Sequence, residues 1–399
     1  MGMRAGMDAV FGLHHLAHAH NAEVAGDYLA GLDAGHEGFG SVSLTPEQHD
    51  LRDAVRGLLA TAGDQAWGRL CREVGVTGLA IPERYGGAGG GAAEVGAVLE
   101  ELGRELTPCP MLGSTVLAAQ ALLGSGDEAA CERLLPAIAD GSATAALAWT
   151  TQAGRWSVAE TGCRAARARL DGAAHYVLDG AGADVLLVAA GAGLVAAGAG
   201  LFEVDPGQDG VSRTGSVTMD PARPLAVVRL TGARGRRVGG DATGALERAR
   251  DLACLALAAE QAGAARRALE LTVEYALTRV QFGRVIGSFQ ALQHRLADLH
   301  VLVESAMALA RAAAADQGPG LGPRAAAAKV YCCEAAMRTA AEMIQLHGAI
   351  GITWEHPAHR YLKRAHGALQ LFGGSAQHTA AIAASLIDCN DTDGTSVLP

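Results

Sequence analysis

The sequence predicts an α+β chain of several domains, in which helices are followed by strands and then by helices again. At 399 residues the chain is too long for one small core, while half of it is hydrophobic and only 19% is charged. Apolar residues recur every three or four positions in the N-terminal and C-terminal parts, as in amphipathic helices. Between these parts, short apolar runs are separated by Gly, Asp and Pro, which is the pattern of an antiparallel β domain.

The composition excludes nucleic acid as the main partner. The formal net charge is −10, and no basic stripe is present to neutralise phosphates. The eight cysteines are scattered and contain no C-x-x-C pair, which favours reduced thiols over a disulfide framework or a zinc site. We therefore expect a cytoplasmic protein without a metal centre.

One segment has the length of a membrane span. Residues 185–202 carry no charge over about 18 positions, the lower limit for crossing a bilayer. Four glycines interrupt the segment. Two short strands joined by a Gly-rich turn is the better interpretation, so we expect no membrane span. The first 40 residues lack a continuous apolar stretch behind a basic start, so we also expect no secretory signal.

Residues 1–42 are interpreted as an N-terminal extension. They carry five of the fourteen histidines, and His14 and His18 are spaced to share one face of a helix. Such a pair could bind a metal, but no carboxylate or Cys stands at a spacing that completes a site. A solvated helical extension is the favoured interpretation.

Residues 43–142 are predicted to form an N-terminal helical domain. Thr45 followed by Pro46 is a helix start, with a capping residue and Pro at the first helical position. The Gly-rich stretch 84–91 interrupts the helical pattern before it resumes at residues 94–106. These glycines could cradle a phosphate, but a nucleotide-binding fingerprint needs a strand directly before them, and none is predicted.

Residues 143–240 form the predicted central β domain, with strands at 184–188, 201–204 and 225–230. Residues 241–399 return to helices. Apolar residues from 289 to 310 mark one face of a long helix, residues 317–323 connect it to the next, and 324–348 form that next helix.

Two runs in the C-terminal part can carry chemistry. In residues 275–290 a long helix ends in a turn that holds Arg279, Gln281 and Arg284 together. Guanidinium groups suit bidentate contact with a pyrophosphate, although a helix hairpin with a solvated basic turn explains the run equally well. In residues 345–357 a helix gives way to a glycine-containing loop, where a ligand can approach the backbone closely.

Together these runs resemble the acyl-CoA dehydrogenase family, whose C-terminal domain reads R-x-x-F-G-x-x-I-x-x-x-Q and later Q-x-x-G-G-x-G. The resemblance is specific over residues 252–374, and residues 81–87 fit a loop of the family's N-terminal domain. It implies an N-terminal helical domain, a central antiparallel β-barrel-like domain and a C-terminal four-helix bundle.

The resemblance also implies FAD as cofactor. It places Arg279, Gln281 and Phe282 against FAD, and Gln345 and Gly348 at its pyrophosphate and adenine side. In this family those groups reach the flavin of a neighbouring subunit, so a dimer or tetramer is implied.

The β domain departs from the family pattern. Family members carry T-E-P-x-x-G-S-D and then W-I-[TS]-[NS], which cover the flavin ring and the substrate thioester. Thr150 keeps a trace of the first motif, and residues 176–180 stand where the second is expected. Ala349 also replaces the second Gly of the C-terminal motif.

The family's catalytic base is missing from both of its usual positions. The chemistry removes a proton beside a thioester carbonyl, which needs a carboxylate in a dry pocket. Gly373 and Ala253 occupy the two positions that the family uses for this carboxylate, and neither residue can accept a proton. Asp251 and Glu247 are the candidate replacements, although they lie roughly 200° and 240° around the helix from Ala253.

Four hypotheses follow. The leading one is a subunit of a heteromeric acyl-CoA dehydrogenase that lends half of an FAD site to a homologous partner. It resembles subunits of the actinobacterial enzymes for bulky, steroid-like CoA thioesters, and an electron-transfer flavoprotein would be the electron acceptor. The alternatives are a self-sufficient dehydrogenase with a relocated base, a non-catalytic acyl-CoA-binding or scaffold protein, and a flavin monooxygenase on the same fold.

Overall fold

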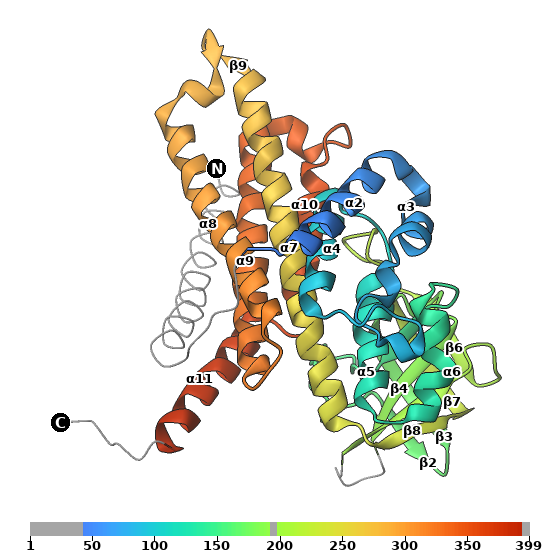
Figure 1. Ribbon diagram of the computed structural model, residues 1–399. Helices are drawn as coiled ribbons and strands as arrows, with labels where there is room; N and C mark the ends of the chain where they lie inside the picture. Colours follow the sequence, from blue (N-terminus) through green and yellow to red (C-terminus); the bar gives the residue numbers. More distant parts are fainter. Residues whose placement is uncertain (1–42, 192–197, 393–399) are drawn as a thin grey trace, which may run out of the picture.

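The computed structural model describes residues 43–191 and 198–392, and the predicted extension 1–42 with its histidines lies outside them. The predicted fold class is confirmed, since N-terminal helices, a central sheet and C-terminal helices follow one another along the chain. Figure 1 shows the sheet and the N-terminal helices on one side of the long C-terminal helices.

The N-terminal part is helical, as predicted, and its start is fixed by a capping box. The Thr45 hydroxyl accepts from the Gln48 amide N–H, while the Gln48 side chain accepts from the Thr45 N–H. The elements of this part are α2 (Pro46–Ala62), η1 (Gly63–Gln65), α3 (Ala66–Arg69), η2 (Leu70–Val74), η3 (Val76–Gly78), η4 (Glu83–Tyr85), α4 (Ala92–Glu105), η5 (Met111–Ala118), α5 (Ala119–Gly124) and α6 (Glu128–Ala139).

The Gly-rich stretch before α4 is a packed turn that offers no phosphate cradle. Every backbone amide from residue 86 to residue 91 donates to a carbonyl of residues 78–83 or to the Glu94 carboxylate. A Cβ built on Gly87 would lie 2.0 Å from the Ile81 carbonyl oxygen, so only glycine fits there. The glycines therefore serve close backbone packing, and no amide of the turn remains for an anion.

The central domain is one mixed sheet that does not close into a barrel. Its strands are β1 (Ala145–Ala148), β2 (Cys163–Ala166), β3 (Arg169–Leu178), β4 (Val185–Gly191), β5 (Ala199–Val204), β6 (Val211–Gly215), β7 (Leu225–Arg234) and β8 (Arg236–Asp241). The order is β6-β7-β3-β2-β4-β5-β8, with β1 beside β4. The predicted antiparallel pairing holds for most of the sheet, but β1 and β2 both run parallel to β4. β1 pairs with Val185–Val188 and β2 with the following residues Ala190 and Gly191, so the connection 149–162 links two strands that lie end to end along β4.

The described parts of the uncharged segment 185–202 form strands, as predicted, while the predicted Gly-rich turn lies outside the described residues. Leu186 pairs with Val204 and Val188 with Phe202 in an antiparallel ladder of β4 with β5. Across residues 43–191 and 198–392, no helix combines the length and apolar character needed to cross a bilayer.

The C-terminal part is a helical bundle built around α7. Its elements are α7 (Thr243–Thr278), β9 (Val280–Gln281), β10 (Arg284–Val285), η6 (Ile286–Ser288), α8 (Gln290–Ala315), α9 (Leu321–His347), η7 (Gly348–Ile352), α10 (Ala358–Gln370) and α11 (Ser375–Thr392). Helix α7 packs against α4, α8 and α9, and Figure 1 shows it between the bundle and the N-terminal helices. A helix covered on several sides must be apolar around most of its circumference, which its Ala-rich sequence provides.

Two glycines allow α4 and α7 to touch backbone to backbone. A Cβ on Gly103 would lie 2.0 Å from the Glu260 carbonyl oxygen, and one on Gly263 would lie 2.0 Å from the Glu100 carbonyl oxygen. The contact is reciprocal, so both helices depend on having glycine at the crossing point.

We expect Gly263→Ala to destabilise the fold. Alanine is the better helix former by about 1 kcal/mol, but the methyl group overlaps a carbonyl on the neighbouring helix, and overpacking costs about 1–3 kcal/mol or more. Chemical denaturation measures the difference. Gly57→Ala is the matched control, since Gly57 lies in α2 with open space around its Cβ position. Equal stability of the two variants would contradict the close contact.

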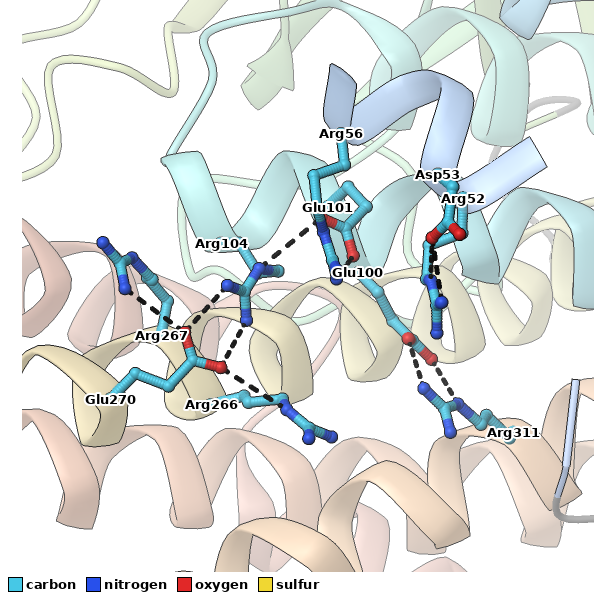
Figure 2. Close-up of polar contacts among 10 residues, drawn as sticks. All are labelled: Arg52, Asp53, Arg56, Glu100, Glu101, Arg104, Arg266, Arg267, Glu270 and Arg311. Carbon is cyan, nitrogen blue, oxygen red and sulfur yellow. Dashed lines mark hydrogen bonds and ion pairs between the residues drawn. The ribbon is translucent and has the colours of Figure 1, made fainter. Parts of the chain in front are cut away.

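A network of ion pairs surrounds this crossing (Figure 2). Glu100 and Glu101 on α4 are each only 2% exposed. Glu100 accepts both hydrogen bonds of the Arg311 guanidinium from α8, and Glu101 accepts two from Arg56 on α2. Arg104 then extends the network to α7. The buried carboxylates thus tie the N-terminal helices to the bundle.

Candidate functional site

The turn after α7 presents its polar residues to solvent. Arg279, Gln281 and Phe282 are all exposed, and the Phe282 ring is 90% exposed. The turn closes as a short hairpin in which Arg284 pairs with Gln281, and both Phe282 and Gly283 have positive φ. Arg279 forms no ion pair within residues 43–191 and 198–392, so its guanidinium is available to an external anion.

The loop after α9 lies at the same end of the bundle. Gln345 and Gly348 are exposed, and Gly348 has a φ of 64°. The His347 ring stacks on Tyr275 from α7, with 4.4 Å between ring centroids, and contacts the His356 ring in a tilted arrangement at 4.2 Å. This column of three rings joins the end of α7 to the loop after α9, so the structure brings the two sequence motifs together.

Large apolar side chains gather on these two loops. Their exposed fractions are unusual for such residues in a folded chain: Leu277 64%, Val280 53%, Phe282 90%, Ile352 72% and Trp354 79%. Exposed apolar residues concentrated at one end of a molecule mark a surface that another molecule covers.

The first position for the family's base cannot hold a carboxylate in this conformation. Gly373 has a φ of 114°, which L-amino acids rarely adopt. A Cβ there would lie 2.9 Å from His378 Nε2 and 3.0 Å from Gln377 Oε1, both from α11. The buried Lys329 ammonium donates to the carbonyl oxygens of Gly373 at 2.5 Å and Leu369 at 2.8 Å. It thereby satisfies the C-terminal end of α10 and fixes the loop.

The second position and its candidate replacements lie elsewhere on α7. Ala253 is fully buried. Asp251 is ion-paired with Arg250 and lies 3.2 Å from a Cβ built on Gly322, so it faces the start of α9. Burial raises the pKa of Asp251 despite this pairing. Glu247 is exposed.

On the sheet side, aromatic rings occupy the space beside Thr150. Trp149 and Trp156 meet edge to face with 5.2 Å between ring centroids, and Trp156 meets Phe372 in the same way at 5.1 Å. These three rings are between 1% and 5% exposed. They join the connection after β1 to the loop after α10. Thr150 is buried beside them, and its carbonyl accepts from the His175 N–H.

A buried set of charges links the sheet to the bundle. Glu260 on α7 accepts from both Arg223 and Arg364, and Arg364 also donates to Asp220. Burial opposes the ionisation of Glu260, but the two guanidinium groups outweigh it and lower its pKa. Glu260 is therefore a structural ion-pair partner.

A small cavity next to this set contains a further carboxyl group. The cavity measures about 20 Å³, room for one water, and is lined by residues that include Asp179, Arg223 and Cys109. Burial raises the pKa of Asp179 to about 7, while the charge of Arg223 acts in the opposite direction. Arg223 Nη1 is buried without a hydrogen-bond partner among the described residues. Over that same part of the chain, no group of three or more His, Cys, Asp or Glu residues is placed to hold a metal ion.

Comparison with known proteins identifies the fold's family. The model of the acyl-CoA dehydrogenase N-terminal domain matches residues 45–142, and that of the C-terminal domain matches residues 242–387. The chain is also 43% identical to the acyl-CoA dehydrogenase IpdE2 of Mycobacterium tuberculosis, over 83% of this chain and 90% of that protein. The chain belongs to the acyl-CoA dehydrogenase family.

Solved structures of family members extend the comparison. The ChsE4–ChsE5 complex from Mycobacterium tuberculosis is similar with a TM-score of 0.79 and 30% identity, covering 87% of this chain and 99% of that chain. A variant of the Tcur3481–Tcur3483 steroid ACAD is similar with a TM-score of 0.75 and 30% identity, covering 86% and 99%.

The acyl-CoA dehydrogenase family is FAD-dependent, and the two halves of the site in this chain differ in how well they fit FAD. At the end of the bundle, the Arg279 guanidinium, which has no ion pair among the described residues, and an exposed glycine turn suit a pyrophosphate. On the sheet side, two residues differ from the family motifs. Leu178 stands at the Thr or Ser position of W-I-[TS]-[NS]. Trp156 stands at the Ser position of T-E-P-x-x-G-S-D when the first Thr of that motif is aligned with Thr150. Both replacements put buried apolar groups where the motif has hydroxyls.

Sequence reasoning missed Lys329, His378 and Trp156. One signal was present for Lys329, because the chain contains only two lysines and this one interrupts an Ala-rich helix. Counting the family motif from Thr150 would have placed Trp156. No sequence signal connects His378 to Gly373, since their contact depends on how the loop turns before α11.

Proposed function

We propose that this chain is the supporting subunit of a heteromeric acyl-CoA dehydrogenase, which desaturates a CoA thioester between its α and β carbons. The chain lends the Arg279 and Gln345 half-site to a homologous partner that holds the flavin ring and the catalytic carboxylate. The single observation that carries the proposal is a contrast between the two halves of the site. At the end of the bundle Arg279 and Gln345 are exposed, whereas on the sheet side buried aromatic rings fill the space beside Thr150.

The chain's own residues would act by binding and positioning. Arg279 would hold the pyrophosphate through paired N–H donors, and the Gly348 turn would let the cofactor backbone approach. Phe282 and the other exposed apolar residues would be covered by the partner. Bound FAD supplies the hydride acceptor for the desaturation. An electron-transfer flavoprotein in the cytoplasm would take the electrons onward.

The internal space of the chain is consistent with a supporting role. A cavity of about 80 Å³ lies between α7 and the N-terminal helices, lined by residues that include Leu252, Ala256 and Thr115. A ligand pocket for a drug-sized molecule measures about 300–1,000 Å³. A bulky, steroid-like acyl group, the substrate class of one similar protein, would therefore be held by the partner.

The alternative of a relocated base has less support. Asp251 is engaged with Arg250, and Glu247 is exposed to water, whereas the reaction needs an unpaired carboxylate in a dry pocket. A scaffold protein without flavin would also explain the buried aromatic rings on the sheet side. It gives no reason why Arg279 is exposed and has no ion pair among the described residues.

Counting flavin tests the proposal. The chain is purified alone and after co-expression with a family member that carries Glu at the position of Gly373, and FAD per chain is measured by absorbance. We expect no FAD in the isolated chain and one FAD per pair of unlike chains. Stoichiometric FAD in the isolated chain would contradict the half-site.

Arg279→Ala within the pair sharpens this test. Loss of a bidentate charge contact is worth about 1.5–3 kcal/mol, so we expect FAD to bind roughly ten- to a hundredfold more weakly. Arg164→Ala is the matched control, because Arg164 is also exposed but lies on β2. Equal FAD affinity of the two variants would exclude Arg279 from the site.

A further inference from the structure

We infer that the sheet-side half of this chain's own flavin site is closed by packing. Trp149, Trp156 and Phe372, called here the ring plug, exclude a flavin ring and a thioester from it. This inference rests on the proposed function, and it adds a reason for inactivity that is independent of the missing carboxylate.

The ring plug joins two segments that are far apart in the sequence. Trp149 and Trp156 come from the connection after β1, and Phe372 comes from the loop after α10. The edge-to-face contacts at 5.2 Å and 5.1 Å are close to the preferred geometry for aromatic pairs. Each such pair contributes about 0.5–1.5 kcal/mol beyond area burial, so opening the plug costs free energy.

Three hydrogen bonds hold Phe372 in the plug. Lys329 donates to the carbonyls of Leu369 and Gly373, on either side of Phe372, and His378 Nε2 contacts the Phe372 carbonyl at 3.0 Å. Phe372 itself has a φ of 59°, unfavourable for a bulky residue unless its surroundings impose it. The loop is therefore held in the one conformation that points this ring at Trp156.

The base position is filled by the same arrangement. His378 and Gln377 stand where a side chain at Gly373 would begin. A side chain at Gly373 would therefore have to displace His378 and Gln377, and it would strain the backbone at a φ of 114°. Trp156 and Phe372 are the residues that decide whether this chain can hold a ring of its own.

The test compares variants in the complex with a homologous partner that carries Glu at the position of Gly373. We expect one FAD per pair of unlike chains for the natural chain. We expect the double variant Trp156→Ser with Phe372→Ala to bind a second FAD per pair. Trp67→Ser is the control, since it removes a partly buried tryptophan of α3, far from the plug in sequence, and should keep one FAD. Two FAD in the natural pair, or one FAD in the double variant, would overturn the inference.

A second measurement needs neither the partner nor the double variant. With Trp67 and Trp354 replaced by Phe, the remaining emission comes from Trp149 and Trp156, the other two of the four tryptophans. We expect acrylamide to quench this emission little, with or without excess FAD. Strong quenching that appears on adding FAD would show that the rings swing away and would overturn the plug. The quenching measurement tests the ring plug even if the pair of unlike chains binds no flavin. Absence of flavin from the pair would contradict the proposed function alone.

Discussion

Replacing Arg364 by Met is expected to destabilise the folded chain by about 3–5 kcal/mol, because it leaves buried carboxylates without their partner. Arg364 is 3% exposed and pairs with both Glu260 and Asp220. Glu260 keeps Arg223, but Asp220 has no other ion pair among the described residues. Denaturation by urea, followed by circular dichroism, measures the loss.

Two further variants identify the cause of this loss. Arg155→Met removes an ion pair whose side chains are 65% and 50% exposed, and it should change stability by less than about 0.5 kcal/mol. Adding Asp220→Asn to Arg364→Met should recover at least about 1 kcal/mol, because the uncompensated charge is gone. A double variant less stable than Arg364→Met would show that the loss comes from packing and not from charge.

Replacing Asp179 by Asn is expected to stabilise the chain above neutral pH. The folded chain holds the Asp179 proton up to a pKa of about 7, whereas the ordinary value is 3.8. Between these values the folded state binds more protons than the unfolded state, so the stability contributed by this group is lost as the pH rises. The loss is on the order of 4 kcal/mol, and asparagine, which stays neutral, does not suffer it.

The two chains are compared by their free energies of unfolding at pH 4 and pH 8. We expect near equality at pH 4 and a more stable Asp179→Asn variant at pH 8. Burial lowers the pKa of His378 to about 4, which gives a pH dependence of the opposite sign, but this contribution is common to both chains and cancels. Asp209→Asn, at an exposed position, is the control for the substitution itself. A constant difference for Asp179→Asn would mean that Asp179 is ionised in the folded chain.

Much of the fold could be predicted because its signals are local. The cap at Thr45, the three- and four-residue apolar spacing, and the glycines within residues 185–202 each depend on neighbours in sequence. Strand direction could not be predicted in this way. The parallel pairing of β1 with β4 depends on which strands meet across the sheet, and the apolar runs carry no record of direction.

Residues of the candidate site that lie in contiguous motifs could be predicted from the sequence, whereas those that meet only in the folded chain could not. Arg279 and Gln345 lie in contiguous motifs, and their position at one end of the bundle follows from the lengths of α7 and α9. The absence of a carboxylate at Gly373 could be seen directly in the sequence. The ring plug could not, because its members come from segments separated by more than 200 positions and meet only after the sheet packs on the bundle.

The column of Tyr275, His347 and His356 also bears on how fast a partner can be captured. A loop that becomes ordered only on binding loses conformational freedom, which costs affinity and slows productive encounters. The column already holds the turn after α7 and the loop after α9 at a fixed spacing in the free chain. In the assembly proposed above, association at this end would be a meeting of preformed surfaces, and its rate would be set by diffusion and orientation in place of loop ordering.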